Sequence, residues 1–156
     1  MFVDEYAYMA KETILCAVDF SEASIQAIRW AISEAQSRKT PLTFLFCYRL
    51  IADGDEVESW NMKKDMESKA LAQFRELETK FIESSMVPYQ FIMEVGFFPS
   101  RIEMFIRRIP VSLLIIGSSI IENFNEYKNL TFDQFLLVSK IPIVVVPETE
   151  STLLPV

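Results

Sequence analysis

The sequence predicts one α/β domain, a three-layer, doubly wound sheet of five parallel strands with helices on both faces. Short apolar runs of strand length alternate with longer segments whose apolar residues recur at helical spacing. This alternation is typical of a parallel sheet joined by right-handed crossovers. The 156 residues, of which 51% are hydrophobic and 13% aromatic, are enough for a single large core. We therefore assign residues 1–156 to one domain, with 1–11 as an N-terminal extension and 148–156 as a C-terminal tail.

The first strand and helix follow directly from the pattern of apolar residues. The run Thr13–Phe20, which contains Asp19, is predicted to be a strand covered on both faces. Isoleucine and alanine then recur at helical spacing over residues 25–35, which predicts a helix with Ser21 or Ser24 as its N-cap.

The next segments predict a second strand, a loop and a long helix. Leu42–Leu50 is an apolar run of strand length. Ile51–Ser59 combines a glycine with four acidic residues, which favours a solvent-exposed loop. From Trp60 to about Ser84, apolar residues step by three or four positions along one face and predict a helix.

A third strand and a shorter helix come next. Tyr89–Val95 has the length and composition of a strand and ends at Gly96. Pro99 is predicted to lie near the start of the following helix, where Ser100 and Glu103 have the spacing of a capping box.

The last third of the chain predicts two strands with a helix between them. Leu113–Ile116 is the fourth strand and ends at Gly117. Thr131 and Gln134 have capping-box spacing for a helix through about residue 139, and the fifth strand is Ile143–Val146.

The composition opposes several classes of partner. The 22 acidic and 15 basic residues give a net charge of −7, which disfavours binding to nucleic acid or to an anionic membrane. No basic start precedes an apolar core as in a secretory signal, and no run approaches the ~20 apolar residues that span a bilayer. We therefore expect a soluble, cytoplasmic protein, in which Cys16 and Cys47 are buried free thiols.

The sequence also disfavours most catalytic sites. It contains no histidine, which excludes Ser-His-Asp and Cys-His nucleophiles, histidine bases and the usual zinc sites. Its three glycines, Gly54, Gly96 and Gly117, form neither a dinucleotide fingerprint nor a P-loop. We expect no catalytic residues, no metal and no enzymatic activity.

Four parts of the chain, in order, resemble the universal stress protein family. They are ILCAVDFSEASIQAIRWA (Ile14–Ala31), Gly96 after the third strand, SLLIIGS (Ser112–Ser118) and PIVVVP (Pro142–Pro147). The ordered set covers nearly the whole chain. The resemblance implies a sheet like that of flavodoxin and the adenine-nucleotide alpha hydrolases, with the strand order 3-2-1-4-5.

Members of that family that bind ATP resemble one another in a loop written Gly, two residues, Gly, nine residues, Gly-Ser. Such glycines let backbone N–H groups approach the phosphates, and the final hydroxyl lies at a helix N-terminus. Laid on this sequence from Gly117, the second glycine falls on Ile120, the third on Leu130 and the serine on Thr131. Branched side chains at the two replaced glycines predict that this loop does not bind a triphosphate.

The resemblance assigns a degenerate nucleotide-binding site to Asp19, Tyr48, Gly117, Ser118 and Thr131. Asp19 matches an aspartate that lies by the nucleoside in ATP-binding relatives, and Tyr48 matches a strand end whose backbone meets the adenine. Thr131 retains the terminal hydroxyl of the loop. Each of these three residues also has a structural interpretation: Asp19 and Thr131 as helix caps, and Tyr48 as a side chain that fills the crevice.

Two functions from different classes remain open. The first is a non-enzymatic stress or regulatory protein of the universal stress type, without ATP or another cofactor, that acts through protein contacts. A homodimer is expected through the last strand, Ile143, Val144, Val145 and Val146, if it lies at a sheet edge; a monomer with this edge shielded by the tail is the alternative. The second function is a sensor that binds an adenine nucleotide, ATP or AMP, in a rearranged loop.

Overall fold

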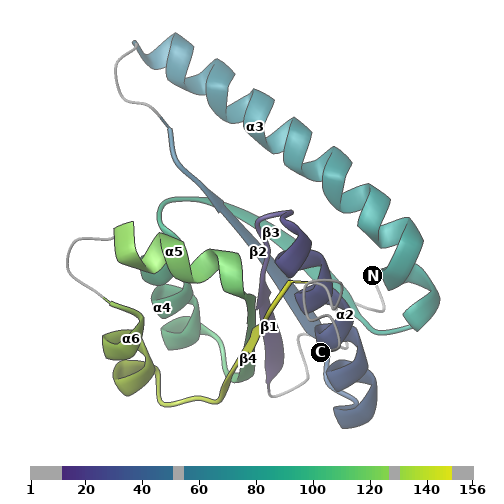
Figure 1. The fold of residues 1–156 in the computed structure, drawn as a ribbon. Helices are drawn as coiled ribbons and strands as arrows, with labels where there is room; N and C mark the ends of the chain where they lie inside the picture. Colours follow the sequence, from purple (N-terminus) through teal and green to yellow (C-terminus); the bar gives the residue numbers. More distant parts are fainter. Residues whose placement is uncertain (1–11, 51–54, 127–130, 149–156) are drawn as a thin grey trace, which may run out of the picture.

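A five-stranded parallel sheet forms the centre of the protein, with the strand order β3-β2-β1-β4-β5 (Figure 1). The computed structural model describes residues 12–50, 55–126 and 131–148. Cys16 of the central strand lies beside Phe44 on one side and Ile115 on the other. The order reverses at β1, as in other doubly wound sheets, and the predicted fold class is confirmed. The strands are β1 (Thr13–Ala17), β2 (Leu42–Tyr48), β3 (Tyr89–Val95), β4 (Val111–Gly117) and β5 (Ile143–Val146).

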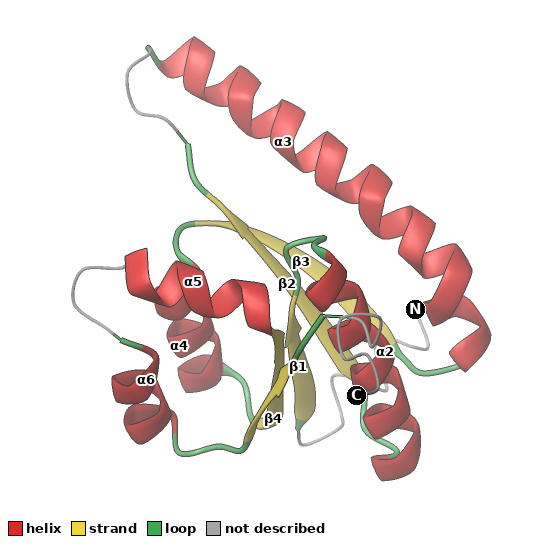
Figure 2. Cartoon of the chain, in the orientation of Figure 1, coloured by secondary structure: helices red, strands yellow, loops and turns green. Residues whose placement is uncertain are grey.

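Helices cover both faces of this sheet (Figure 2). Helices α2 and α3 lie on one face, and α4, α5 and α6 lie on the other. A π-helical turn, Glu78–Ile82, and a 3-10 turn, Glu83–Ser85, connect α3 to β3. The helices are α2 (Glu22–Arg38), α3 (Glu56–Leu77), α4 (Phe98–Arg108), α5 (Ser118–Glu126) and α6 (Phe132–Ser139). No helix in the described ranges is long and apolar enough to cross a membrane.

The two helical layers enclose two separate apolar cores. Successive side chains of a strand point to opposite faces, so that Ile14 and Cys16 belong to the core under α2 and α3. Leu15 and Ala17 belong to the core under α4, α5 and α6. Every residue of β1 is buried, because the strand has a neighbour on each side and a helical layer on each face.

Two of the predicted helix starts are confirmed in detail. The hydroxyl of Ser21 caps α2 and accepts the backbone N–H of Ser24 at 3.2 Å. At α6, the Thr131 hydroxyl accepts the N–H of Gln134 at 3.2 Å, and the Gln134 side chain accepts the N–H of Thr131 at 3.0 Å. These two bonds form the predicted capping box.

The capping box predicted at Ser100 and Glu103 is wrong, whereas Pro99 lies in the first turn of α4, as predicted. The helix begins at Phe98, and its N-cap is Phe97, which provides no side-chain cap. Because Phe98 and Pro99 are buried against the sheet and proline fits the first turn, the helix starts three residues before the position that an N-cap at Ser100 implies. Ser100 therefore lies inside the first turn, and its hydroxyl donates to the Phe97 carbonyl at 3.2 Å.

The long helix α3 also begins earlier than predicted. It starts at Glu56 instead of Trp60, and Asp55 caps it by accepting the N–H of Glu58 at 2.8 Å. The acidic residues that suggested a loop thus occupy the helix N-terminus, where the helix dipole favours negative charge. Residues 51–54 of the predicted loop lie outside the described residues.

A fifth helix, α5, was not predicted. It begins at Ser118, directly after the last residue of β4, and occupies most of the segment that the resemblance aligns with a phosphate loop. Ile120 and Phe124 are both fully buried. Their spacing of one helical turn is the sequence pattern that could have predicted this helix. The predicted extension 1–11 and residues 149–156 of the predicted tail lie outside the described residues.

Candidate functional site

The carboxylate of Asp19 is the centre of a hydrogen-bonded cluster at the carboxyl end of β1. Its Oδ1 accepts the backbone N–H of Ser21 at 3.0 Å and the hydroxyl of Ser21 at 2.6 Å. Its Oδ2 accepts the hydroxyl of Ser119, the second residue of α5, at 2.7 Å. Both oxygens of the carboxylate are thus occupied by donors from the chain itself. Asp19 does not cap α2, because that position belongs to Ser21.

Serine side chains connect this cluster to both flanking helices. The hydroxyl oxygens of Ser21 and Ser119 lie 2.7 Å apart although the residues are 98 positions apart in the sequence. The hydroxyl of Ser24, which is fully buried, accepts the backbone N–H of Asp19 at 2.9 Å. The starts of α2 and α5 are therefore joined through Asp19. Sequence reasoning missed Ser119; its only signal was a second serine directly after Ser118.

Phe20, next to Asp19, has a strained backbone. Its φ of 62° lies in the left-handed region, which bulky residues rarely adopt. Its ring packs against Phe46, with ring centroids 5.2 Å apart, and against Phe91 at 6.4 Å. These contacts hold the turn that leads the chain from β1 into α2 and aims the Asp19 carboxylate toward α5.

Gly117 has a packing role. A Cβ atom on this residue would lie 2.7 Å from the carbonyl carbon of Ala23 and 2.8 Å from the backbone nitrogen of Ser24. The end of β4 therefore touches the first turn of α2 too closely for any side chain. This contact explains the glycine without a bound phosphate.

Ile120, which the resemblance aligns with the second glycine of the ATP-binding loop, lies in the first turn of α5. Ile120 is fully buried in the core beneath α4, α5 and α6. Phe124 packs edge-on against Phe132 and Phe135, with centroid distances of 5.2 and 5.0 Å. The first two turns of α5 are thus fixed by core packing as well as by Ser119. Leu130, aligned with the third glycine, lies outside the described residues.

Thr131 and Ser118 do not join the Asp19 cluster. Thr131 is exposed, and its hydrogen bonds within the described part of the chain form the capping box with Gln134. Ser118 is the first residue of α5 and is half-buried, and it is the neighbouring Ser119 that bonds to Asp19. Of the predicted site residues, Asp19 and Gly117 therefore both contact the first turn of α2, and Ser118 is linked to Asp19 only through its neighbour Ser119.

Tyr48 binds α3 to the sheet. It is buried, its hydroxyl donates to the Glu67 carboxylate of α3, and its ring stacks on Phe46 at 5.9 Å. Burial and the hydrogen bond to Glu67 both raise the pKa of the Tyr48 phenol well above its usual range. The backbone of Tyr48, which the resemblance places at the adenine, is also engaged, since its carbonyl accepts the N–H of Gly96 at 2.8 Å. The hydroxyl, the ring and the backbone carbonyl of Tyr48 are therefore all engaged by other residues of the fold.

A pocket of about 230 Å³ lies beside Tyr48, at the carboxyl ends of β2 and β3. The Arg49 guanidinium lies over the Phe97 ring, 4.7 Å from its centroid. Aromatic rings and Met66 of α3 form most of the wall, which is suited to a small flat group. The lining includes Phe46, Tyr48, Arg49, Met66, Phe97 and Phe98.

The two cysteines are buried thiols, as predicted. Neither is in a disulfide, and burial raises the pKa of both Cys16 and Cys47, which keeps them protonated. Among the described residues no group of three or more His, Cys, Asp or Glu side chains is arranged to hold a metal ion.

Comparison with known proteins agrees with this architecture. Universal stress protein UspA from Lactobacillus plantarum is 18% identical, covers 87% of this chain and 97% of its own, and superposes with a TM-score of 0.65. A universal stress protein solved in complex with cAMP is 15% identical and covers 90% of this chain and 99% of its own, with a TM-score of 0.64. The universal stress protein from Archaeoglobus fulgidus, solved in complex with dAMP, is 18% identical and covers 88% and 99%, with a TM-score of 0.60. At these identities the likeness establishes the fold alone.

The family assignment comes from the sequence itself. No curated protein matches the chain. The sequence profile of the universal stress protein family, in contrast, matches residues 11–147, which is most of the chain and spans all five strands. The chain therefore belongs to the universal stress protein family.

Proposed function

We propose that this chain is a regulatory or stress-response protein of the universal stress type that does not bind ATP and acts through protein contacts. The observation that carries the proposal is the hydrogen bond from Ser119 to Asp19, which holds α5 closed against the end of β1. The aspartate that the resemblance aligns with the nucleoside contact is thereby bonded internally, and the segment that it aligns with the phosphate loop contains the helix α5.

The energies favour the closed arrangement. To present its backbone N–H groups as a phosphate loop, the start of α5 would have to unwind and withdraw Ile120 from the core. Exposing a buried isoleucine costs about 1.5–3 kcal/mol, and losing a hydrogen bond to a charged group costs about 1.5–3 kcal/mol. A helix N-terminus returns only about 0.3–1 kcal/mol toward an anion at an exposed site. The exposed Glu122 on α5 and the net charge of −7 add repulsion.

We propose further that the protein is not an enzyme and uses no cofactor. The Asp19 carboxylate is shared between Ser21 and Ser119, and the sequence has no histidine that would activate either hydroxyl as a nucleophile. This combination supports a structural role for the serine cluster.

The partner proposed first is a second copy, joined through β5. The strand order leaves β5 at an edge of the sheet, and the side chain of Val145 is 37% exposed. An apolar edge strand of this kind offers unpaired backbone groups to a symmetric partner. The residues concerned are Ile143, Val144, Val145 and Val146.

The test combines mass spectrometry with thermal unfolding. We expect no nucleotide to accompany the gently purified protein, and ATP, AMP and cyclic AMP to leave its melting temperature unchanged. A nucleotide-binding universal stress protein treated in the same way serves as the positive control. A bound nucleotide, or a clear stabilisation at millimolar ligand, would overturn the proposal, because a ligand that binds only the folded state must stabilise it.

One observation favours the alternative, an adenine-nucleotide sensor. The pocket beside Tyr48 has aromatic walls and an arginine at its margin, which suits a planar base attached to an anionic group. Two structurally similar universal stress proteins were solved with cAMP and dAMP. A stabilisation by AMP that Arg49→Gln abolishes would support the sensor over the first proposal.

A further inference from the structure

Another pocket lies between α4 and β3, the strand at the opposite edge of the sheet from β5. Its volume is about 190 Å³, and its wall combines charged and apolar side chains. The lining residues are Glu94, Arg101, Met104, Phe105, Arg108 and Ile109. None of them lines the pocket beside Tyr48. An apolar wall with a few charged groups is typical of a site for a small molecule.

The guanidinium of Arg101 is only weakly paired by the protein. Its Nη1 lies 3.6 Å from Oε1 of Glu94, which is an ion pair but too long for a hydrogen bond. Its Nε is buried and has no hydrogen-bond partner in the described part of the chain. An arginine has five N–H donors, and buried donors are nearly always bonded. Because the side chain is still 33% exposed, Arg101 keeps donors for an acceptor that enters the pocket.

Gly96 holds the Arg101 side chain in place from below. A Cβ atom on Gly96 would lie 2.7 Å from Nε and 3.1 Å from Cγ of Arg101. The φ of this glycine is 141°, a conformation that other residues rarely adopt. The arginine therefore lies directly on the main chain that follows β3. Packing of this kind limits the side-chain freedom that Arg101 would lose when an anion binds.

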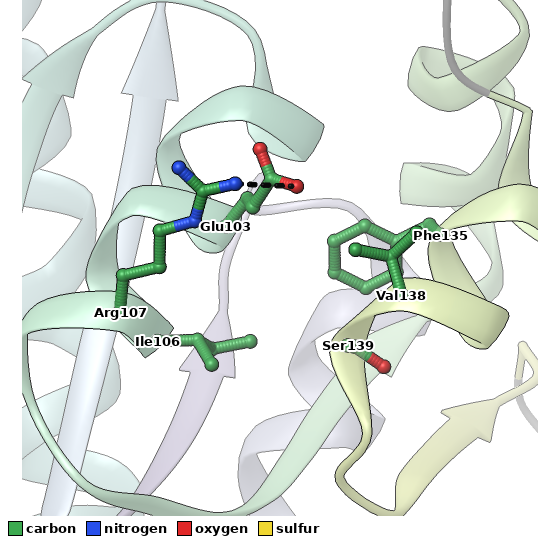
Figure 3. A pocket seen from close by; sticks show the side chains of 6 residues that line it. All are labelled: Glu103, Ile106, Arg107, Phe135, Val138 and Ser139. Carbon is green, nitrogen blue, oxygen red and sulfur yellow. Dashed lines mark ion pairs between the residues drawn. The ribbon is translucent and has the colours of Figure 1, made fainter.

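Arg108 brings a second positive charge to the same pocket. It lies about two helical turns after Arg101, on the same side of α4. It is exposed and has no ion-pair partner within residues 12–50, 55–126 and 131–148. The adjacent Arg107 pairs instead with Glu103 at 3.7 Å, beside a hollow that α6 also lines (Figure 3). Two arginines against one glutamate leave one positive charge of the pocket unmatched.

We propose that this pocket binds a small organic acid that has one carboxylate and an apolar body. The carboxylate lies between Arg101 and Arg108, since the planar guanidinium matches the geometry of a carboxylate. The apolar body covers Met104, Phe105 and Ile109, the last of which is 42% exposed without it.

The charge of the pocket selects a monoanion over a dianion. A single carboxylate neutralises the one unmatched positive charge. A phosphate group with two negative charges would place the second charge near Glu94, where like charges repel. The apolar part of the wall would also remain uncovered by inorganic phosphate.

Calorimetry and thermal unfolding with three probes at low ionic strength test the proposal. The probes are hexanoate, its uncharged analogue hexanamide, and inorganic phosphate. We expect hexanoate to bind and to raise the melting temperature, because a ligand that binds the folded state stabilises it. Hexanamide and phosphate should bind more weakly, and added salt should weaken the binding of hexanoate.

Substitution of the two arginines identifies the site. Arg108→Gln should weaken hexanoate binding by about two- to fivefold, as expected for a pair at an exposed arginine. Arg101→Gln should weaken it by about tenfold or more, because this arginine is half-buried. Arg107→Gln is the matched control, since Arg107 is also exposed and does not line the pocket. If Arg101→Gln fails to fold, the comparison of Arg108→Gln with Arg107→Gln decides.

Glu94→Gln gives the sharpest test, because it should improve binding. Removing the carboxylate that competes for Arg101 should tighten hexanoate binding by about two- to fivefold. It should also let phosphate bind, since two positive charges are then unmatched. If the Glu94–Arg101 pair served only the fold, this variant would bind hexanoate no better than the wild type.

Four results would overturn the proposal. They are no binding of hexanoate, equal binding of hexanamide, equal losses in Arg107→Gln and Arg108→Gln, and weaker binding by a folded Glu94→Gln. The inference is also separate from the proposed function. The pocket shares no lining residue with the pocket beside Tyr48 and does not include Asp19, so failure of either proposal leaves the other standing.

Discussion

Gly117→Ala distinguishes two explanations for the glycine at this position: the close contact between β4 and α2, and the backbone freedom that a phosphate loop requires. In a flexible phosphate loop, alanine would be well tolerated in the free protein. In the structure, the added methyl group would lie 2.7–2.9 Å from three backbone atoms of Ala23 and Ser24. Backbone atoms in the first turn of a packed helix cannot move aside as the end of a flexible side chain can, so β4 and α2 must separate.

The expected loss follows from overpacking. Forcing one methyl group into a packed contact costs about 1–3 kcal/mol. For a domain of this size, 1 kcal/mol lowers the melting temperature by about 2–4 °C, so Gly117→Ala should lower it by roughly 2–12 °C.

Thermal and urea unfolding of Gly117→Ala should be measured beside Ser118→Ala. The control changes the neighbouring, half-buried residue and should alter the free energy of unfolding by less than about 1 kcal/mol. If Gly117→Ala were as stable as the wild type, the packing explanation would be refuted. A role of Gly117 in a phosphate loop would then be the better explanation of the glycine.

Three further predictions concern hydrogen bonds of the fold. Ser119→Ala should lower the free energy of unfolding by about 1.5 kcal/mol, because it removes a hydrogen bond to the Asp19 carboxylate; unchanged urea unfolding would contradict the closed cluster. Thr131→Ala should cost about 1 kcal/mol through loss of the α6 cap, and amide hydrogen exchange should increase mainly in α6; equal exchange throughout would argue against the capping box. The pKa values of Tyr48 and Tyr89 are raised in the folded state, so their contribution to stability is complete below the ordinary tyrosine pKa of about 10 and is lost as the pH rises above it. The double variant Tyr48→Phe with Tyr89→Phe should therefore lose less stability than the wild type between neutral and alkaline pH, and an identical loss would contradict the two tyrosine–glutamate pairs.

The helix starts show where reading the sequence succeeded and where it failed. The capping box at Thr131 was predicted because both of its bonds are local, between residues three apart. The same spacing at Ser100 predicted a capping box that does not form, because burial of Phe98 against the sheet determines where α4 begins. At α3, acidic residues that were assigned to a loop instead stabilise a helix N-terminus that begins at Glu56.

The sequence by itself determined the fold class and the family of this protein. Alternating apolar runs and helical stripes specify local structure, and a parallel sheet with two helical layers is the arrangement that buries both. The ordered motifs from Ile14 to Pro147 carried the family resemblance, which the match over residues 11–147 confirms.

Only the tertiary structure decided the state of the candidate site. The bond between Ser119 and Asp19 joins residues 100 positions apart, and the contact that requires Gly117 to be a glycine comes from α2, which precedes β4 by two strands. Burial of Ile120 likewise depends on α4 and α6 packing around it. Sequence patterns report interactions over a few positions, whereas the contacts around Asp19 depend on which distant groups meet when the two helical layers pack on the sheet.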